Sequence, residues 1–262
     1  MHPGAWIAWT ACAALVAFSS TNPFYLLLVM AVCWFVYSAN RRPGPAGRTF
    51  RFFLITAAVA IFFRTALVAI SWDLTASNLA FAAMEGLRLG TLLVVFGTFN
   101  SVTDPYGVLR LAPRHFHEPA LAAALALSMA PRTIDAAGRV LEAQTMRGIR
   151  ASKWRSIPAL AVPVLETGMD EAVTLAESMD SRGHGRGARS RYRPQPWTSR
   201  ALISAAAAAL TAAAFIAAGI ERYGMLNPPT DPLVWPQVSL PLAATILLLA
   251  MPAFLPQGGN ET

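Results

Sequence analysis

Long apolar runs recur along this 262-residue chain and constrain its fold more than any other feature. Residues 52–72 form one such run, which as an α-helix would measure about 31 Å and would cross the hydrocarbon core of a bilayer. Only 13% of the residues are charged, against about a quarter in soluble domains. The sequence therefore predicts an all-α, polytopic membrane protein.

About six transmembrane helices are expected. Residues 5–20 and 23–38 are two shorter apolar runs separated by Asn22-Pro23, a turn signal, and they are predicted to form a helical hairpin. The other expected spans are residues 52–72, 79–99, 201–220 and 238–255. Six crossings place both termini on one side of the membrane. The basic connections on that side favour the cytoplasm, so the chain is expected in the cell membrane with both termini inside.

The middle of the chain has a different, amphipathic pattern. Residues 119–130 are apolar but too short to cross, so they are expected to dip into the membrane or to lie on its surface. Residues 132–148 and 165–182 each predict an amphipathic helix. The apolar stripes comprise Ile134, Ala137, Leu141 and Thr145 in the first helix, and Leu165, Met169, Ala172, Ala176 and Met179 in the second. A helix break is expected at Pro158 between them.

Basic residues are concentrated in the same middle region. Residues 132–200 hold twelve of the 21 Lys and Arg residues, which beside membrane segments favours cytoplasmic loops over nucleic-acid binding. The arginines of residues 186–193 are expected to hold the next span to the cytoplasmic face. Three segments follow from this pattern: N-terminal transmembrane helices at 1–114, a cytoplasmic coupling-helix region at 115–200, and C-terminal transmembrane helices at 201–262.

Few residues in the predicted spans could carry chemistry. Arg64, Glu85 and Arg88 are charged positions within spans, and an interhelical ion-pair cluster is favoured over a proton path, which usually needs several acids or histidines. His115 and His117 are too isolated to predict a metal site. The sequence has no phosphate-binding P-loop, G-x-S-x-G or H-E-x-x-H motif, so neither an enzyme nor a metal or cofactor on this chain is expected.

Two matching motifs end the amphipathic segments. Residues 142–148 read EAQTMRG and residues 177–183 read ESMDSRG, so Arg147-Gly148 and Arg182-Gly183 stand in the same setting. Arg followed by Gly is a common way to end a helix. An exposed arginine at a helix tip is also suited to binding an acidic or carbonyl-lined groove on another protein, and the pairing of the motifs favours such a docking role.

The paired motifs, with SVTDPYGVLRL (residues 101–111) and LAESMDSRGHG (residues 175–185), resemble the transmembrane T component of energy-coupling-factor (ECF) transporters, the family of cobalt and nickel permeases. The resemblance covers essentially the whole chain and implies two long coupling helices that cross. Each helix would end in an X-Arg-X triplet that inserts into one of two ABC-type ATPase subunits. The corresponding triplets are Met146, Arg147, Gly148 and Ser181, Arg182, Gly183; the family often has Ala where Met146 and Ser181 stand.

The resemblance also implies the partners and the activity. Besides the two ATPases, which would bind ATP and Mg, a separate substrate-binding membrane subunit (the S component) would deliver a vitamin or a transition-metal ion. The lipid bilayer completes the partners, and no nucleic acid is expected. Small residues such as Ala136 and Ala172 would let the coupling helices cross closely. The alternative is an ion-coupled secondary transporter, which would usually show inverted repeats and broken spans.

Overall fold

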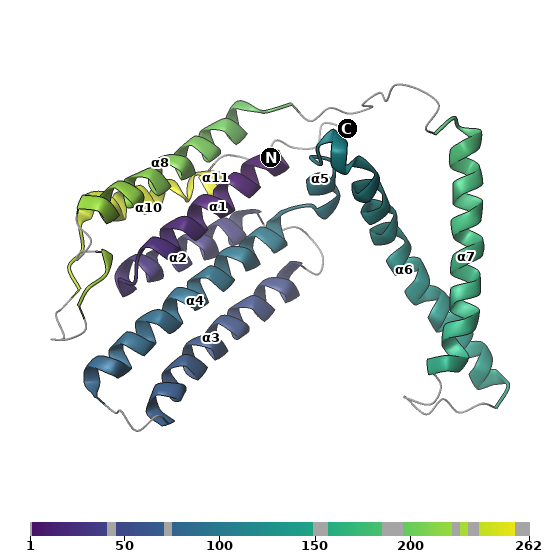
Figure 1. Cartoon of the computed structure of the whole chain (residues 1–262), viewed down its shortest axis with the longest axis horizontal. Helices are drawn as coiled ribbons and strands as arrows, with labels where there is room; N and C mark the ends of the chain where they lie inside the picture. The colour runs from purple at the N-terminus through teal and green to yellow at the C-terminus, as the bar shows by residue number, and fades with distance from the viewer. Residues whose placement is uncertain are drawn as a thin grey trace. The chain divides into compact units, whose positions relative to one another are not determined.

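The computed structural model describes residues 2–40, 46–70, 75–148, 157–184, 196–221, 226–229 and 236–254. Every regular element in these ranges is a helix, which confirms the predicted all-α class (Figure 1). The chain divides into two compact units. Met1–Leu111 and Gln195–Thr262 together form the first, here the membrane unit; Ala112–Pro194 forms the second, here the helix-pair unit. The helices at the two ends of the chain thus share one unit.

The membrane unit contains eight described helices: α1 (Pro3–Ser19), α2 (Pro23–Asn40), α3 (Ala46–Ile70), α4 (Ala76–Val102), α5 (Pro105–Leu109), α8 (Ser199–Glu221), α10 (Leu240–Leu248) and α11 (Met251–Phe254). Among the described residues, α2, α3, α4 and α8 are long and apolar enough to cross a membrane, and α1 is a shorter apolar helix. The chain is a multi-pass membrane protein, as predicted. The number of six crossings and the cytoplasmic position of both termini stay predictions.

The last predicted span, residues 238–255, is divided in the structure. It forms α10 and α11, which are separated at Leu249 and Ala250. Pro252 has no backbone N–H and its ring would clash with the carbonyl four residues earlier. The N–H groups of Leu249 and Ala250 instead bond to the carbonyls three residues before them, at 3.0 Å each. The predicted span is thus made of two short helices because this proline interrupts the ladder, and its crossing of the membrane stays a prediction.

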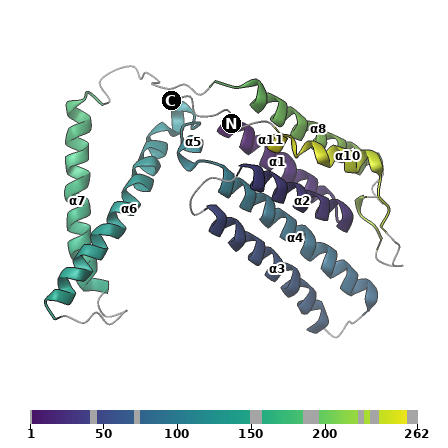
Figure 2. The same cartoon turned by 180° about the vertical axis from the view of Figure 1, so that it is seen from behind.

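Aromatic side chains from both ends of the chain fill the core of the membrane unit. Trp9 of α1 is 1% exposed, and its indole Nε1 donates to the carbonyl of Leu249 at 2.9 Å. Tyr25 of α2 and Phe215 of α8 meet edge to face, with ring centroids 5.6 Å apart. These contacts hold α8 and the α10–α11 segment against α1 and α2, as both views of the fold show (Figures 1 and 2).

The predicted Asn22-Pro23 turn joins α1 to α2. Asn22 is fully buried; its side-chain oxygen accepts from the N–H of Phe24 at 3.1 Å, and its amide nitrogen donates to the carbonyl of Gln237 at 2.9 Å. The carbonyl of Leu226 accepts from Thr21 and Asn22. The turn is therefore confirmed, and it also holds the chain between α8 and α10.

α3 packs chiefly on α4 through a seam of small residues. A Cβ at Gly97 would lie 2.6 Å from the Cβ of Phe53, and one at Gly86 would lie 3.1 Å from the Cα of Ile61. Gly86 and Gly90 form a G-x-x-x-G spacing, which lets helix backbones approach closely in membranes. Most of α3 outside this seam is exposed, including Phe52, Ile55 and Phe62.

The helix-pair unit contains η1 (Arg114–Phe116), α6 (His117–Met146) and α7 (Ile157–Ser181). α6 is one helix of 30 residues with Pro131 inside it, so the predicted division between residues 119–130 and 132–148 was wrong. Pro131 removes one N–H and kinks or strains a helix, but Leu127, whose carbonyl loses that bond, is exposed and can bond to water. Pro158 lies in the first turn of α7, where no N–H is needed.

Candidate functional site

The two predicted docking motifs lie at the ends of the long helices of the helix-pair unit. α6 and α7 contact each other and run in opposite directions, crossing towards the end where α6 finishes and α7 starts (Figures 1 and 2). Ala136, which is buried, is consistent with the close crossing that its small side chain predicts. Arg147 follows α6 and Arg182 follows α7, so the antiparallel arrangement separates the two arginines along the pair.

The first motif ends α6 through a left-handed glycine. Arg147 is the C-cap, and its N–H bonds to the carbonyls of Ala143 and Gln144 at 3.2 and 3.1 Å. Gly148 has φ of 77° and donates to the carbonyl of Thr145 at 3.0 Å. Only glycine adopts this conformation without strain. The motif therefore fixes where the helix stops and leaves the arginine side chain at its tip.

The second motif repeats this geometry at the end of α7. Gly183 has φ of 78° and donates to the carbonyl of Asp180 at 2.8 Å, while His184 donates to the carbonyl of Met179 at 3.0 Å. This pair of bonds is the Schellman arrangement. The shared sequence pattern thus corresponds to a shared backbone geometry, with each arginine in the position between the last helical residue and the glycine.

Both arginines are exposed, together with the residues that precede them. Met146 is 85% exposed, and Ser181 directs its hydroxyl back to the carbonyl of Ser178 at 2.9 Å. Within the described part of the chain, no ion pair or hydrogen bond engages either guanidinium group. The structure therefore places the six predicted site residues as two triplets, one at the end of each helix, of which only Gly183 is half-buried.

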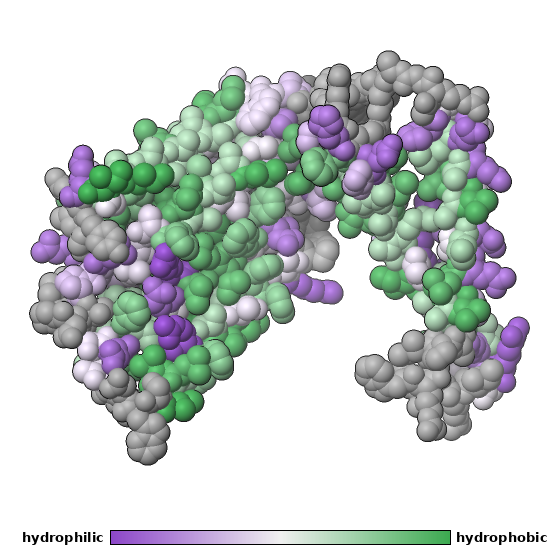
Figure 3. Space-filling model, in the orientation of Figure 1, coloured by the Kyte–Doolittle hydropathy of each residue, from purple (hydrophilic) through white to green (hydrophobic). Residues whose placement is uncertain are grey.

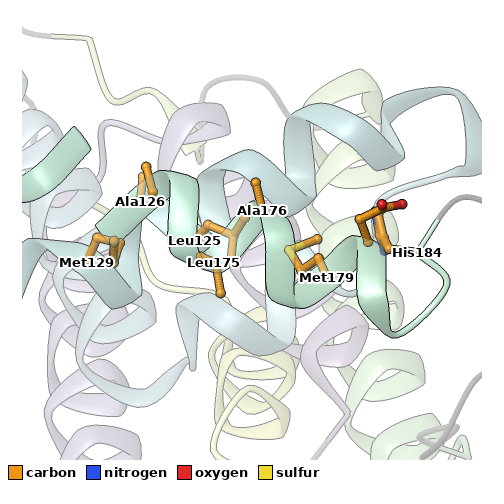
Figure 4. Close-up of a pocket in the computed structure, with 9 residues that line it drawn as sticks. Leu125, Ala126, Met129, Leu175, Ala176, Met179 and His184 are labelled. Atoms are coloured by element: carbon orange, nitrogen blue, oxygen red, sulfur yellow. The ribbon is translucent and has the colours of Figure 1, made fainter. Parts of the chain in front are cut away.

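A groove of about 410 Å³ lies between α6 and α7 beside the second motif (Figure 4). Its α6 wall is Leu125, Ala126 and Met129, and its α7 wall includes Leu175, Ala176 and Met179. Asp180 and His184 are the polar residues of its lining. Sequence reasoning did not single out His184, although the Arg-Gly-His order around residue 183 could have drawn attention to it.

The predicted apolar stripes are only partly used between the two helices. Ala172, Ala176 and Met179 line the groove as part of the predicted α7 stripe. Ile134, in contrast, is 72% exposed, and Leu165 and Met169 are also exposed. Figure 3 shows apolar side chains on the visible surface of both helices. The pair therefore presents apolar surface that its own described residues do not cover.

The charged residues of the membrane unit form the predicted pair in part. Arg88 contacts Glu85 on the same helix at 3.3 Å, donates to the carbonyl of Phe18, and stacks over the Phe18 ring at 4.3 Å. Arg64 lies beside Gly86, but no ion pair links it to Glu85 within the described residues. The Glu85–Arg88 pair is confirmed, and the structure does not bring Arg64 into it.

Other sequence expectations concern metals and the basic tail. In the part of the chain that the structure describes, no three His, Cys, Asp or Glu side chains gather as metal ligands would. His115 is exposed on η1, and the side chain of His117 lies outside the described residues. Residues 149–156 and the basic residues 186–193 also lie outside them.

The fold and the site define a class: an α-helical, multi-pass membrane protein with a pair of long helices that end in exposed Arg-Gly motifs. Residues 1–195 match the model of the family described as cobalt transport protein (CbiQ), and the chain belongs to this family. The family predicted from the paired motifs is thereby confirmed.

A similar protein has a name that points to the same group. The energy-coupling factor transporter transmembrane protein EcfT of Streptococcus thermophilus (strain ATCC BAA-250 / LMG 18311) is 32% identical over 129 residues. The match covers 45% of this chain and 49% of EcfT. The chain therefore spans about half the length of this relative.

Proposed function

We propose that this chain is the T component of an ECF-type importer. In this role it transmits the ATP-driven motion of two ABC-type ATPase subunits to a separate S component, which takes up a vitamin or a transition-metal ion. The family and the similarity to EcfT support the proposal. The observation that carries it is the pair of exposed arginines, each held at the tip of a long helix by a left-handed glycine.

Each arginine is chemically suited to seat in a groove of an ATPase. Guanidinium is planar, permanently charged and has five N–H donors, so it can bond several carbonyl or carboxylate oxygens at once. Because the motifs end antiparallel helices, each ATPase would engage one end of the pair. Movement of the two subunits towards each other on binding ATP would then change the angle between α6 and α7. ATP and Mg would bind to the ATPases, and this chain would have no catalytic residues.

The exposed apolar side chains of the helix pair supply a surface for the S component. Val162, Leu165, Met169 and Val173 recur at spacings of three and four and are all more than half exposed. Such spacing puts them on one stripe of α7. A membrane subunit that packs on this stripe would be moved when the helices move. The transport cycle would take place in the cell membrane.

The docking role is tested by reversing both charges. The double variant Arg147→Glu and Arg182→Glu should abolish co-purification of the ATPases and ATP-driven uptake, while the chain remains in the membrane. The matched control is Arg132→Glu with Arg139→Glu, which makes the same charge change at two exposed positions within α6. Wild-type ATPase binding by the first double variant, or equal loss in the control, would contradict the proposal.

A further inference from the structure

Two segments of the membrane unit next to its boundaries with the helix-pair unit pack on one element, the N-terminus of α1. The chain leaves the membrane unit shortly after α5, at Leu111. α5 contacts α1, and a Cβ at Gly107 of α5 would lie 3.0 Å from the Cγ of Pro3. α5, the last helix before this boundary, therefore rests directly on the first turn of α1.

The segment that precedes α8 packs on the same turn. The chain re-enters the membrane unit at Gln195, and the ring of Trp197 stacks on the ring of His2, with centroids 4.4 Å apart and planes at 24°. A Cβ at Gly4 would lie 3.2 Å from Cζ2 of Trp197. Because α8 begins at Ser199, this stacking joins the start of α8 to the start of α1.

His2 fixes the first turn of α1 and the position of Trp197 at the same time. Its Nδ1 accepts from the N–H of Gly4 at 3.1 Å, which is an N-cap bond. Its ring face is covered by Trp197, and the residue is buried. The hydrogen bond uses the edge of the imidazole and the stacking uses its face, so one side chain serves both contacts.

We propose that His2 and Trp197 are positioning residues for energy coupling, which fasten the start of α8 to α1 as Pro3 and Gly107 fasten α5. Displacement that reaches α5 or the start of α8 is then delivered to α1. α1 passes it on, because it packs on α4 and α8 and its Trp9 bonds to Leu249. The source of the displacement rests on the proposed function.

Substitutions at residue 2 separate the two roles of His2. His2→Asn keeps a good N-cap acceptor but removes the ring, whereas His2→Phe keeps a ring for stacking and removes the acceptor. Trp197→Leu removes the stacking from the other side. The matched control is Trp34→Leu on α2, because Trp34 and Trp197 are 54% and 50% exposed and the Trp34 ring packs on Phe50 of α3.

Cys12 of α1 is a natural reporter of motion. The sequence contains two cysteines, so Cys33→Ala leaves Cys12, which is half-buried, as the sole thiol. The rate of Cys12 labelling by N-ethylmaleimide is measured in the purified complex with the ATPases, with and without a non-hydrolysable ATP analogue. The nucleotide should change this rate in the parent chain, in His2→Phe and in Trp34→Leu, and the change should be lost in His2→Asn and Trp197→Leu.

The measurement can overturn the inference in two ways. A nucleotide-dependent rate that persists in both His2→Asn and Trp197→Leu would show that the stacked rings do not deliver the motion. A rate that nucleotide leaves unchanged in the parent complex would show that the motion does not reach α1.

Failure of the proposed function is recognised separately, because the ATPases would then not co-purify with the parent chain. In that case, amide hydrogen exchange of the chain alone tests whether Trp197 and His2 hold these segments on α1. Trp197→Leu should speed exchange in the first turn of α1 and in α5, which are distant from residue 197 in sequence. Unchanged exchange in both segments would overturn the proposal.

Discussion

The membrane unit and the helix-pair unit differ in how completely they bury their own apolar side chains. The first has a core of fully buried residues such as Trp9, Tyr25 and Phe215. In the second, Ala136 is the one buried side chain among the residues whose burial the structure describes. Uniformly apolar helices thus make a core in one unit, and amphipathic helices leave an exposed apolar surface in the other.

This difference indicates that the helix-pair unit needs other molecules to complete it. Each Å² of apolar surface removed from water contributes about 25 cal/mol, so open stripes on α6 and α7 are a source of binding energy. Large exposed apolar patches mark interaction sites in proteins. The membrane unit can tolerate exposed apolar side chains on α3 because lipid is their solvent. The comparison therefore supports the proposed division, in which one unit provides stability and the other binds partners.

The largest contrast is expected from truncating one large side chain in each unit. Trp9→Ala removes a buried indole and its bond to Leu249, and such changes cost about 3–5 kcal/mol. Ile134→Ala removes an exposed side chain and should change the stability of the isolated chain by less than about 0.5 kcal/mol. Thermal unfolding of the purified chain in detergent measures both. Equal destabilisation by the two variants would contradict the comparison.

A smaller contrast should follow from adding a methyl group to a glycine in each unit. At Gly97 the new Cβ would lie 2.6 Å from the Cβ of Phe53, so α3 and α4 must separate, at a cost of about 1–3 kcal/mol. At Gly138 of α6 no atom lies within 4 Å, and Gly→Ala in an open helix stabilises by up to about 1 kcal/mol. The unfolding temperatures of the two variants should therefore shift in opposite directions. A Gly97→Ala variant more stable than the parent chain would contradict the close packing of α3 on α4.

The sequence predicted the helices better than their contacts. Apolar length alone indicated α2, α3, α4 and α8, because a helix that crosses a bilayer needs a run that local composition reveals. It did not predict that α6 continues through Pro131 or that Pro252 divides the last segment. Whether a proline ends a helix depends on what surrounds the freed carbonyl, and that is a property of the tertiary structure.

The candidate site could be predicted where its amino-acid sequence determines the backbone conformation. Arg-Gly pairs indicate helix ends, and both glycines have the left-handed conformation that makes glycine necessary there. The packing of Trp197 on His2 could not be predicted, because it joins residues from opposite parts of the sequence. The Gly86 to Gly90 spacing was readable in the sequence, and the expected cluster of Arg64, Glu85 and Arg88 already placed residues 52–72 beside this helix.

Replacing a helix-end glycine by alanine should destabilise the helix end by about 1–2 kcal/mol, which is the cost of a left-handed backbone for a residue with a Cβ. Gly148→Ala and Gly183→Ala meet no steric clash, so this strain is their only direct cost. Amide exchange in the last turns of α6 and α7 should rise and ATPase binding should weaken. Gly168→Ala, within α7 and also free of neighbours, is the control. Unchanged exchange in both helix-end variants would show that the glycine of the Arg-Gly motif is not needed to end the helix.

The smallest effect is expected from neutralising Glu85. Gln at this position keeps an oxygen that can accept from Arg88, whose guanidinium also contacts the carbonyl and ring of Phe18. If the pair is structural, Glu85→Gln should leave ATP-driven uptake near the wild-type rate, and uptake should persist when an uncoupler collapses the proton gradient at constant ATP. A proton-coupled transporter would lose uptake in both cases, since a carboxylate on the path must exchange protons and an amide cannot. The charges inside the membrane unit would then have a transport function, and the division of roles between the two units would no longer hold.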